Sequence, residues 1–496
     1  MYYIGIDLGT SAVKLLLMKE DGTVAKIVSK EYPLSFPKPG WSEQNPSDWW
    51  TQSVAGLKEL TADINREEIG GISFGGQMHG LVILDENDEV IRPAILWNDG
   101  RTVKETEYLN TIIGTEKLSK YTGNIAFAGF TAPKILWVQT HEPENFAKIR
   151  RIMLPKDYLA YKLTGVSSTD YSDASGMLLL DVEHKCWSKE MMEICHVKEE
   201  WLPTLFESYE KTGTLKAEVA KELDFPVTCI VAAGAGDNAA AAVGTGVVGT
   251  DEKGAGKCNL SLGTSGTMFI TNDSYSVDPK NALHSFAHAD GKFHLMGCML
   301  SAASCNKWWM EDILKTTDFA GEQEGIQHHL GDNHVYFLPY LMGERSPHND
   351  PMARGTFVGM RLDTTRTDML QAVFEGVAYA LRDSLEVARS SGVALTRTTI
   401  CGGGAKSPLW RTIVANVMNL EVDTVEVEEG PAYGGAILAA VASGAFASVE
   451  EGVAKIVRKK DTTSPCPELV AKYEAGYQKF RQIYPALKEV YQELTK

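Results

Sequence analysis

Two segments that stand about half the chain apart share a turn sequence suited to holding phosphate. Asp7 ends an apolar segment and is followed by Gly9-Thr10-Ser11, and Gly263-Thr264-Ser265-Gly266 repeats the turn between two further apolar segments. Such a turn exposes backbone N–H groups and hydroxyls to phosphate oxygens, while the carboxylate can hold Mg²⁺. A plain polar hairpin turn is the alternative for one copy. Two copies favour a pair of phosphate-binding hairpins facing each other across a cleft.

A single carboxylate, Asp237, stands in a run of small residues after the apolar segment 229–233 and before an alanine-rich segment. The carboxyl end of a strand is where α/β folds bind their ligands. A carboxylate in that place can accept the proton of an attacking hydroxyl. Capping of the following helix explains Asp237 equally well, because Asp is favoured at helix N-termini.

A run of three glycines, Gly402 to Gly404, joins an expected strand that ends at Cys401 to an expected helix from about Pro408. Glycines there allow the backbone to approach a flat ligand such as adenine, although a structural turn accounts for them as well. The run is not a GxGxxG motif, and no GxxxxGK[ST] sequence occurs. These observations argue against the dinucleotide-binding and P-loop classes.

Alternating strand and helix patterns must position these residues, and they indicate the α/β class. Asn45 followed by Pro46 predicts the start of a helix, and Asp21-Gly22 predicts a hairpin. A long helix capped near Thr367 and stopped by Gly392 is expected in the second half. The expected strands are 3–6, 13–18, 24–28, 71–74, 259–262 and 267–271.

The repeated turn, in equivalent strand–turn–strand settings, predicts a duplicated domain. With 496 residues the chain is too long for one ordinary core. Gly244, Gly246 and Gly249 punctuate the chain near its middle. We therefore expect two domains, 1–248 and 249–496, with a terminal helix from about 467 that packs back on the body.

Charge and composition exclude several classes of function. A net charge of −17 argues against a nucleic-acid partner. The first residues lack the features of a signal peptide, and no apolar run reaches the roughly 18 residues of a membrane span, so a cytoplasmic protein is expected. His284, His288 and His294 lie near Cys298. Zinc binding is one interpretation of them, and alternating strand residues of a hairpin are the favoured one.

Two longer segments, 129–137 and 355–360, resemble the signature stretches of the FGGY carbohydrate kinases. The resemblance covers nearly the whole chain, and it is strongest to the D-xylulose kinase branch of that family. Glycerol kinases would show an Arg-Glu pair where this chain has Met78-His79. The segments most similar to the D-xylulose kinase branch are 77–80, 94–101, 154–157, 236–238 and 338–345.

The resemblance implies two actin-like, ribonuclease H-like domains with a deep cleft, the sugar bound by the first domain and ATP mainly by the second. It implies that Asp237 is the catalytic base and that Asp7 holds Mg²⁺. The residues implied for the sugar are Met78, His79 and Asn238. Those implied for ATP and its phosphates are Thr10, Ser11, Thr264, Gly403, Gly404 and Ser407. Trp308 either flanks the adenine or packs within a helix.

His79 follows an expected strand and sits among glycines, so its side chain is expected to be displayed toward a ligand. A neutral imidazole there can hydrogen-bond a sugar hydroxyl. Trp49, Trp50 and Trp97 are further candidates for the sugar pocket. Core packing is favoured for Trp49 and Trp50, because both lie on an expected helix.

The implied reaction is transfer of the γ-phosphoryl group of ATP to the 5-hydroxyl of D-xylulose, giving D-xylulose 5-phosphate in pentose catabolism. One alternative is a kinase for another ketose or polyol. A second, from another class, is an actin-like nucleotide-dependent chaperone or assembly protein. The segment 77–79 and Asp237 count against the second, because a binding module needs no general base. A homodimer is expected from the family alone.

Overall fold

The computed structural model describes residues 1–252 and 254–494, and it contains two large mixed β-sheets. In the first sheet, the central strand pairs antiparallel with the strand that follows it and parallel with a later one. This sheet has the order β13 (Lys211–Thr214), β14 (Ile230–Ala232), β5 (Ile69–Gly76), β1 (Tyr2–Leu8), β2 (Ala12–Lys19) and β3 (Val24–Glu31), with β15 (Ala235–Gly236) also on β5.

The second sheet repeats the arrangement of the first. Its central strand β16 pairs antiparallel with β17 and parallel with β22. The two Gly-Thr-Ser turns therefore occupy equivalent places, and the predicted duplication is confirmed. The order is β18 (His284–Ala287), β19 (Phe293–Met299), β17 (Gly266–Asn272), β16 (Cys258–Leu262), β22 (Arg397–Cys401), β23 (Glu421–Val425) and β24 (Lys459–Thr463).

Helices cover both faces of the first sheet. On one face α1 (Pro46–Leu60), α6 (Pro155–Thr164) and α9 (Ala217–Leu223) share a hydrophobic core with β1 and β2. As expected, Asn45 caps α1, where its side chain accepts a hydrogen bond from Ser47 N. The remaining helices around this half are α2 (Val103–Glu107), α3 (Thr115–Thr122), α4 (Thr131–His141), α5 (Pro143–Lys148), α7 (Tyr171–Ala174) and α8 (Lys189–Ile194).

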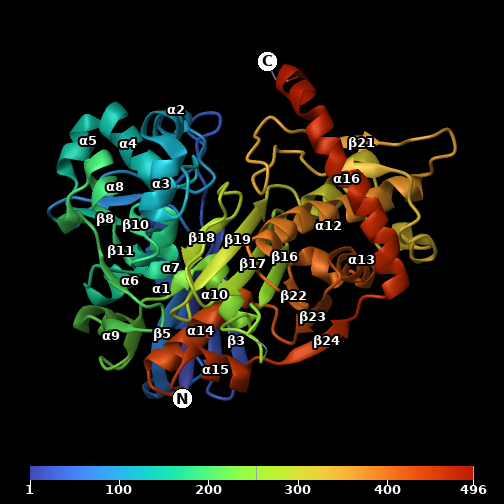
Figure 1. Cartoon of the computed structure of the whole chain (residues 1–496). Coiled ribbons are helices and arrows are strands. Elements are labelled where there is room, and N and C mark those ends of the chain that lie inside the picture. Colours follow the sequence, from blue (N-terminus) through green and yellow to red (C-terminus); the bar gives the residue numbers. More distant parts are fainter. Residues whose placement is uncertain (253, 495–496) are drawn as a thin grey trace.

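The opposite face of the first sheet is covered partly by the second half of the chain. The helix α14 (Gly430–Ala442) packs against β1, β5 and α10 (Asp237–Gly244). Figure 1 shows α14 and α15 (Val449–Ile456), in orange-red, beside the blue first strands. The approach is close: a Cβ added to Gly434 would lie 1.9 Å from the carbonyl oxygen of Ala240. Residues 430–456 therefore complete the core of the first half.

The second sheet packs against α12 (Arg366–Ser390), α13 (Pro408–Met418) and α16 (Pro467–Leu494). The cap of α12 is Thr365, so the sequence-based choice of Thr367 is wrong. Thr365 can close a reciprocal box, because Asp368 lies three residues on: its hydroxyl accepts from Asp368 N (3.2 Å) and the Asp368 carboxylate accepts from Thr365 N (2.8 Å).

The expected terminal helix is present as α16, which crosses α12 and α13 in red in Figure 1. Tyr473 and Tyr477 are buried, and their hydroxyls donate to Glu375 (3.0 Å) and Asp383 (2.7 Å) of α12. No helix in residues 1–252 and 254–494 is long and apolar enough to cross a membrane.

Candidate active site

A cavity of about 250 Å³ opens between the two halves, and it gathers side chains that are distant in sequence. Met78 and His79 reach it from the end of β5, and Asp237 and Asn238 from the start of α10. The second half contributes the turn that contains Thr264. The three residues expected to bind the sugar and the expected base therefore share one cavity with one of the two phosphate turns.

The imidazole of His79 is held in a defined orientation and protonation state. Its Nδ1 lies 2.8 Å from the carbonyl oxygen of Gly176, so Nδ1 carries the proton and donates. Burial, reinforced by the nearby charge of Lys134, lowers the pKa of His79 to about 3. The ring, stacked on Phe130 at 4.7 Å, is therefore neutral at pH 7. Its Nε2 is left as a hydrogen-bond acceptor, suited to a sugar hydroxyl.

Asp237 is the first residue of α10, and the cap of that helix is Gly236. One of its carboxylate oxygens, Oδ1, accepts from the backbone N–H of Asn238 (2.7 Å) and from the Asn238 amide (2.9 Å). Burial raises the pKa of Asp237 to about 6, against the opposing effect of these hydrogen bonds. A carboxyl group with this pKa is largely ionised at pH 7 and close to the ideal for a general base.

A buried cation supports the strand end that carries Asp237. The Nζ of Lys156 lies 2.8 Å from both Asp157 and Asp170, and all three side chains are inaccessible to solvent. Asp170 accepts from the hydroxyl of Ser172, which in turn accepts from Gly236 N at 3.1 Å. The network ties α6 to the residue before Asp237. Sequence reasoning noticed segment 154–157 only as a resemblance and missed this network; the adjacent Lys156 and Asp157 within the otherwise apolar segment 152–160 were the available signal.

A second lysine, Lys134 of α4, fixes the backbone at His79. Its fully buried Nζ donates to the carbonyl oxygens of His79 (2.8 Å) and Gly129 (2.6 Å). Thr131 adds a hydrogen bond to the same His79 carbonyl at 3.1 Å. The histidine is thus positioned through its backbone and its ring, which leaves only Nε2 free to meet a ligand.

The first phosphate turn lies next to the cavity and outside its lining. Thr10 Oγ1 accepts from the indole N–H of Trp97 at 2.9 Å, and Trp97 itself lines the cavity. Ser11 follows in the same turn, between β1 and β2. Burial, together with the charge of Asp237, raises the pKa of Asp7 to about 7. The structure therefore places Asp7 in the electrostatic field of Asp237.

The glycine run after β22 forms the short helix η8 (Gly403–Lys406), and its glycines differ in their surroundings. A Cβ on Gly402 (φ +89°) would lie 2.7 Å from the Leu262 carbonyl, and one on Gly404 would lie 2.9 Å from both Leu262 and Trp410. A Cβ on Gly403 would meet nothing within 4 Å. Packing therefore requires glycine at 402 and 404, whereas Gly403 leaves an open surface.

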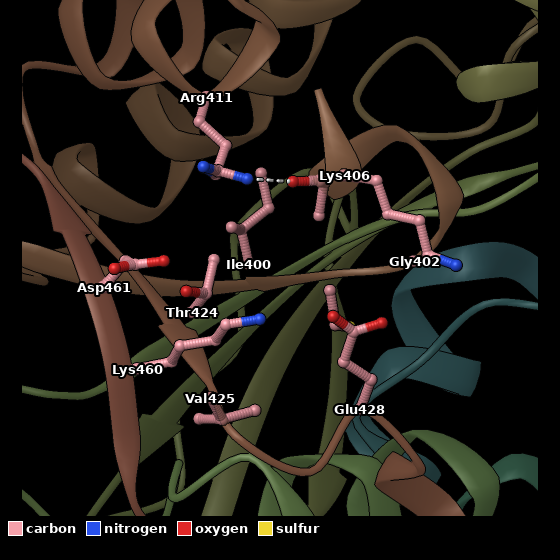
Figure 2. Close-up of a pocket in the computed structure, with 11 residues that line it drawn as sticks. Ile400, Gly402, Lys406, Arg411, Thr424, Val425, Glu428, Lys460 and Asp461 are labelled. Carbon is pink, nitrogen blue, oxygen red and sulfur yellow. Dashed lines mark hydrogen bonds between the residues drawn. The ribbon is translucent and has the colours of Figure 1, made fainter. Parts of the chain in front are cut away.

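A separate cavity of about 260 Å³ lies beside this run, at the carboxyl ends of the parallel strands β22 and β23. Figure 2 shows Lys460 and Asp461 of β24 on the opposite side of it from Lys406. Ser407 lines neither cavity: its hydroxyl caps α13 by accepting from Trp410 N (3.2 Å) and donates to Gln323 (2.7 Å). The glycine run is thus not part of the Asp237 cavity.

Of the tryptophans and histidines considered from the sequence, some pack within the protein and others line the cavity. Trp49 is fully buried, and Trp308 stacks on Phe337 at 6.2 Å, whereas Trp97 lines the cavity. The expected hairpin of β18 and β19 is confirmed; it contains His284, which also lines the cavity, and His294. In the described part of the chain, no three His, Cys, Asp or Glu side chains are grouped to hold a metal ion.

Comparisons with known proteins agree with this geometry. The N-terminal domain model of the FGGY family of carbohydrate kinases matches residues 2–244, and its C-terminal domain model matches residues 258–443. Xylulose kinase of Escherichia coli (strain K12) is 40% identical and covers 98% of this chain and 99% of its own length. Xylulose kinase of Bacillus subtilis (strain 168) is 38% identical, covering 99% and 98%.

Solved structures are similar over the full length. A xyloylose kinase from Brucella ovis superposes with a TM-score of 0.93 at 38% identity, covering 99% of this chain and 100% of its own. The ligand-bound xylulose kinase from Lactobacillus acidophilus gives a TM-score of 0.94 at 27% identity, covering 99% of both chains. With two matching domain models and relatives of 40% identity, the chain belongs to the FGGY family of carbohydrate kinases, and it is a two-domain enzyme of the actin-like ATPase class.

Proposed function

We propose that this enzyme transfers the γ-phosphoryl group of ATP to the 5-hydroxyl of D-xylulose. The observation that carries the proposal is the single cavity in which Asp237 (pKa raised to about 6) and neutral His79 meet the Thr264 turn. The xylulose kinases named above, similar over nearly the whole chain, support the choice of sugar. This reaction would place the enzyme in pentose catabolism.

In the proposed mechanism Asp237 orients the 5-hydroxyl and accepts its proton. The hydroxyl oxygen forms a bond to the γ-phosphorus while the bond from that phosphorus to the β–γ bridging oxygen breaks, and ADP leaves with the electron pair. Asn238 holds the Asp237 carboxylate by two hydrogen bonds, so the base is fixed before the sugar arrives. Its pKa of about 6 lets it take the proton at neutral pH.

The other acceptor contacts would come from Met78, His79 and Asn238. His79 offers Nε2 to a sugar hydroxyl, because its Nδ1–H is already used by Gly176. Met78 is buried against Gly236, where an added Cβ would approach its side chain to 2.9 Å, so it forms an apolar wall beside the base. An apolar side chain and a neutral imidazole therefore stand where glycerol kinases would show a charged Arg-Glu pair, and both suit a neutral sugar acceptor.

Mg²⁺ fits the acidic side chains at the base of the cleft. Burial and the charge of Asp237 together raise the pKa of Asp7 to about 7, so a cation beside Asp7 would relieve the repulsion between the two carboxylates. Mg²⁺ is usually bound through one or two carboxylates together with substrate phosphates, so the lack of a three-carboxylate cluster in the described residues is compatible with it. When bound, Mg²⁺ would neutralise charge on the phosphates of ATP.

The nucleotide would lie mainly on the second half of the chain. In this proposal Thr10, Ser11 and Thr264 bind phosphate oxygens through their turns, because exposed N–H groups and hydroxyls suit anions. At the other end of the nucleotide, Gly403 and Gly404 would approach the adenine ring, with Ser407 next to them. The two predicted domains, 1–248 and 249–496, would close on the ligands, with residues 430–456 moving with the first because they complete its core; assembly as a homodimer remains a prediction.

A coupled assay of ADP release with a panel of ketoses, polyols and glycerol tests the proposal. D-xylulose should give the highest kcat/KM, and mass spectrometry of the product should show one added phosphoryl group. ATP turnover that ignores every sugar would instead favour the chaperone-like alternative. A preference for glycerol over D-xylulose would overturn the sugar assignment and leave the kinase family intact.

A further inference from the structure

The acceptor cavity contains a cation that forms no ion pair. Arg345 lies in the segment after β20 (Tyr336–Leu338) and lines the cavity together with His79 and Gly129. In residues 1–252 and 254–494 no carboxylate lies within ion-pairing distance of its guanidinium, although other arginines of the same half do form such pairs. Those arginines are Arg366, Arg382, Arg389 and Arg397.

The groups around Arg345 do not balance its charge. Burial raises the pKa of Glu344 to about 8, and its Oε1 is occupied by the N–H groups of Arg345 (2.7 Å) and Leu300 (3.1 Å). Burial also lowers the pKa of His284 well below its usual range and raises that of the neighbouring Cys298 thiol. These neighbours are therefore mostly neutral at pH 7. Ionised Asp237 lines the same cavity, but no carboxylate of the described residues pairs with the guanidinium, which is in this sense an unbalanced positive charge.

Arg345 reaches across the cleft to the wall formed by the first half. Its guanidinium carbon lies 5.2 Å from the centre of the Phe127 ring, and one of its nitrogens lies 3.9 Å from the place of a Cβ on Gly129. Its charge also contributes to the lowered pKa of His79. Arg345 therefore lies on the His79 side of the cavity, where the non-reacting part of an acceptor would extend when its terminal hydroxyl faces Asp237.

We propose that Arg345 is a further acceptor-binding residue, which donates hydrogen bonds to the carbonyl and hydroxyl oxygens at the end of the sugar opposite to the reacting hydroxyl. The inference rests on the proposed function, because that function sets the orientation of the sugar. A guanidinium presents five N–H donors in a planar fork, so it can bind two neighbouring oxygens at once. An acceptor held in this way would contact both halves of the protein.

The unbalanced charge has a consequence for ligand choice. A sugar acid such as D-xylonate carries a carboxylate at the end where the ketose has its carbonyl. That carboxylate can form a bidentate, charge-assisted pair with the guanidinium. D-xylonate should therefore compete with D-xylulose, and it should compete better than xylitol, which is neutral and of similar size.

The test compares Arg345→Met with the wild type in steady-state kinetics. Methionine approximates the aliphatic stem of the arginine side chain and removes its charge and donors. The KM for D-xylulose should rise roughly 10- to 100-fold, as expected for loss of hydrogen bonds from a charged donor. The KM for ATP should change little, and inhibition by D-xylonate should weaken at least as much as the KM rises. Unchanged KM and unchanged inhibition by D-xylonate would overturn the inference.

Arg354→Met is the matched control, since Arg354 lies in the same segment and its side chain, within the described part of the chain, donates to the carbonyls of Pro351 (2.9 Å) and Ala353 (2.8 Å) and to no ligand-facing group. It should leave the KM for D-xylulose unchanged; an equal rise in both variants would show that the segment merely loosens, and would overturn the inference. If Arg345→Met does not fold, Arg345→Lys replaces it, with an intermediate rise in KM expected and an unchanged KM contradicting the role.

The proposed function can fail separately from this inference. Wild-type enzyme that does not phosphorylate D-xylulose refutes the proposed sugar. The same comparison is then made with the best acceptor of the panel and the acid that corresponds to it. An Arg345→Met variant that binds that acceptor as tightly as the wild type would refute the role of Arg345.

Discussion

The proposed acceptor side and the proposed nucleotide side of the site are built in different ways. On the acceptor side, buried lysine side chains fix the ligand-facing groups: Lys134 holds the His79 carbonyl, and Lys156 supports the strand end before Asp237. On the nucleotide side, the turn at Gly403 presents open backbone, and its neighbours are held by close packing of glycine against Leu262. Under the proposed function, groups fixed by buried lysines would select and activate the hydroxyl, and backbone shape would meet the nucleotide.

The sharpest test of the acceptor side is Asp237→Asn. The amide has nearly the same shape, and its oxygen can still accept from Asn238 N, so the fold should persist. It cannot take the hydroxyl proton, and loss of a positioned base typically lowers the rate roughly 10²- to 10⁴-fold. Affinity for an ATP analogue, measured by calorimetry, should be unchanged. A variant with near-normal kcat would remove Asp237 from the proposed mechanism.

The buried network should matter most for stability. Lys156→Met leaves Asp157 and Asp170 without their cation, and breaking a buried ion pair in this way costs about 3–5 kcal/mol of unfolding free energy. Chemical denaturation of the purified variant measures this loss. Lys162→Met is the control on the same helix, since the Nζ of Lys162 lies 5.7 Å from the centre of the Trp50 ring and forms no ion pair among the described residues. If both variants lose the same small amount of unfolding free energy, the buried lysine does not hold the acceptor side in place, and the contrast with the nucleotide side is wrong.

On the nucleotide side, two neighbouring glycines should behave differently. Gly402→Ala places a Cβ against the Leu262 carbonyl at positive φ, which costs about 1–2 kcal/mol from the backbone conformation alone. Gly403→Ala meets no protein atom, so its stability should match the wild type while its KM for ATP rises several-fold. Thermal unfolding measures the stability of both variants, and steady-state kinetics measures their KM for ATP. A Gly403→Ala variant with normal ATP kinetics would indicate that the nucleotide does not approach this residue.

The smallest expected effect is a shift in the pH dependence. Only ionised Asp237 can accept a proton, and burial raises its pKa to about 6 in the folded protein. At saturating Mg²⁺, kcat/KM for the sugar should therefore fall about tenfold per pH unit below about pH 6, well above the range of an ordinary carboxyl group. A profile that stays flat down to pH 5 would contradict the raised pKa.

Local features of the fold could be predicted because their causes lie within a few residues. Asn45 precedes the helix that it caps, and the hairpin at Asp21-Gly22 joins two neighbouring strands. The cap of α12 was misplaced, because Thr365 and Thr367 are both good caps and only the reciprocal bond with Asp368 separates them. The candidate site residues were found through motifs and resemblance; Lys134 and Lys156 lie inside two of the resembling segments, but their roles were missed because the groups they hold, the His79 carbonyl and Asp170, are brought to them only by the fold.

The repeated turns, the class of the fold and the family follow from the sequence alone, because each depends on short patterns along the chain. Which distant residues meet depends instead on the folded structure. Lys14 pairs with Glu429 at 2.5 Å, and Tyr433 donates to the Gly22 carbonyl at 2.8 Å, each across more than 400 residues. Such contacts form because α14 returns to bury its apolar surface on the first sheet, and the free energy of that burial depends on the whole fold rather than on any local pattern.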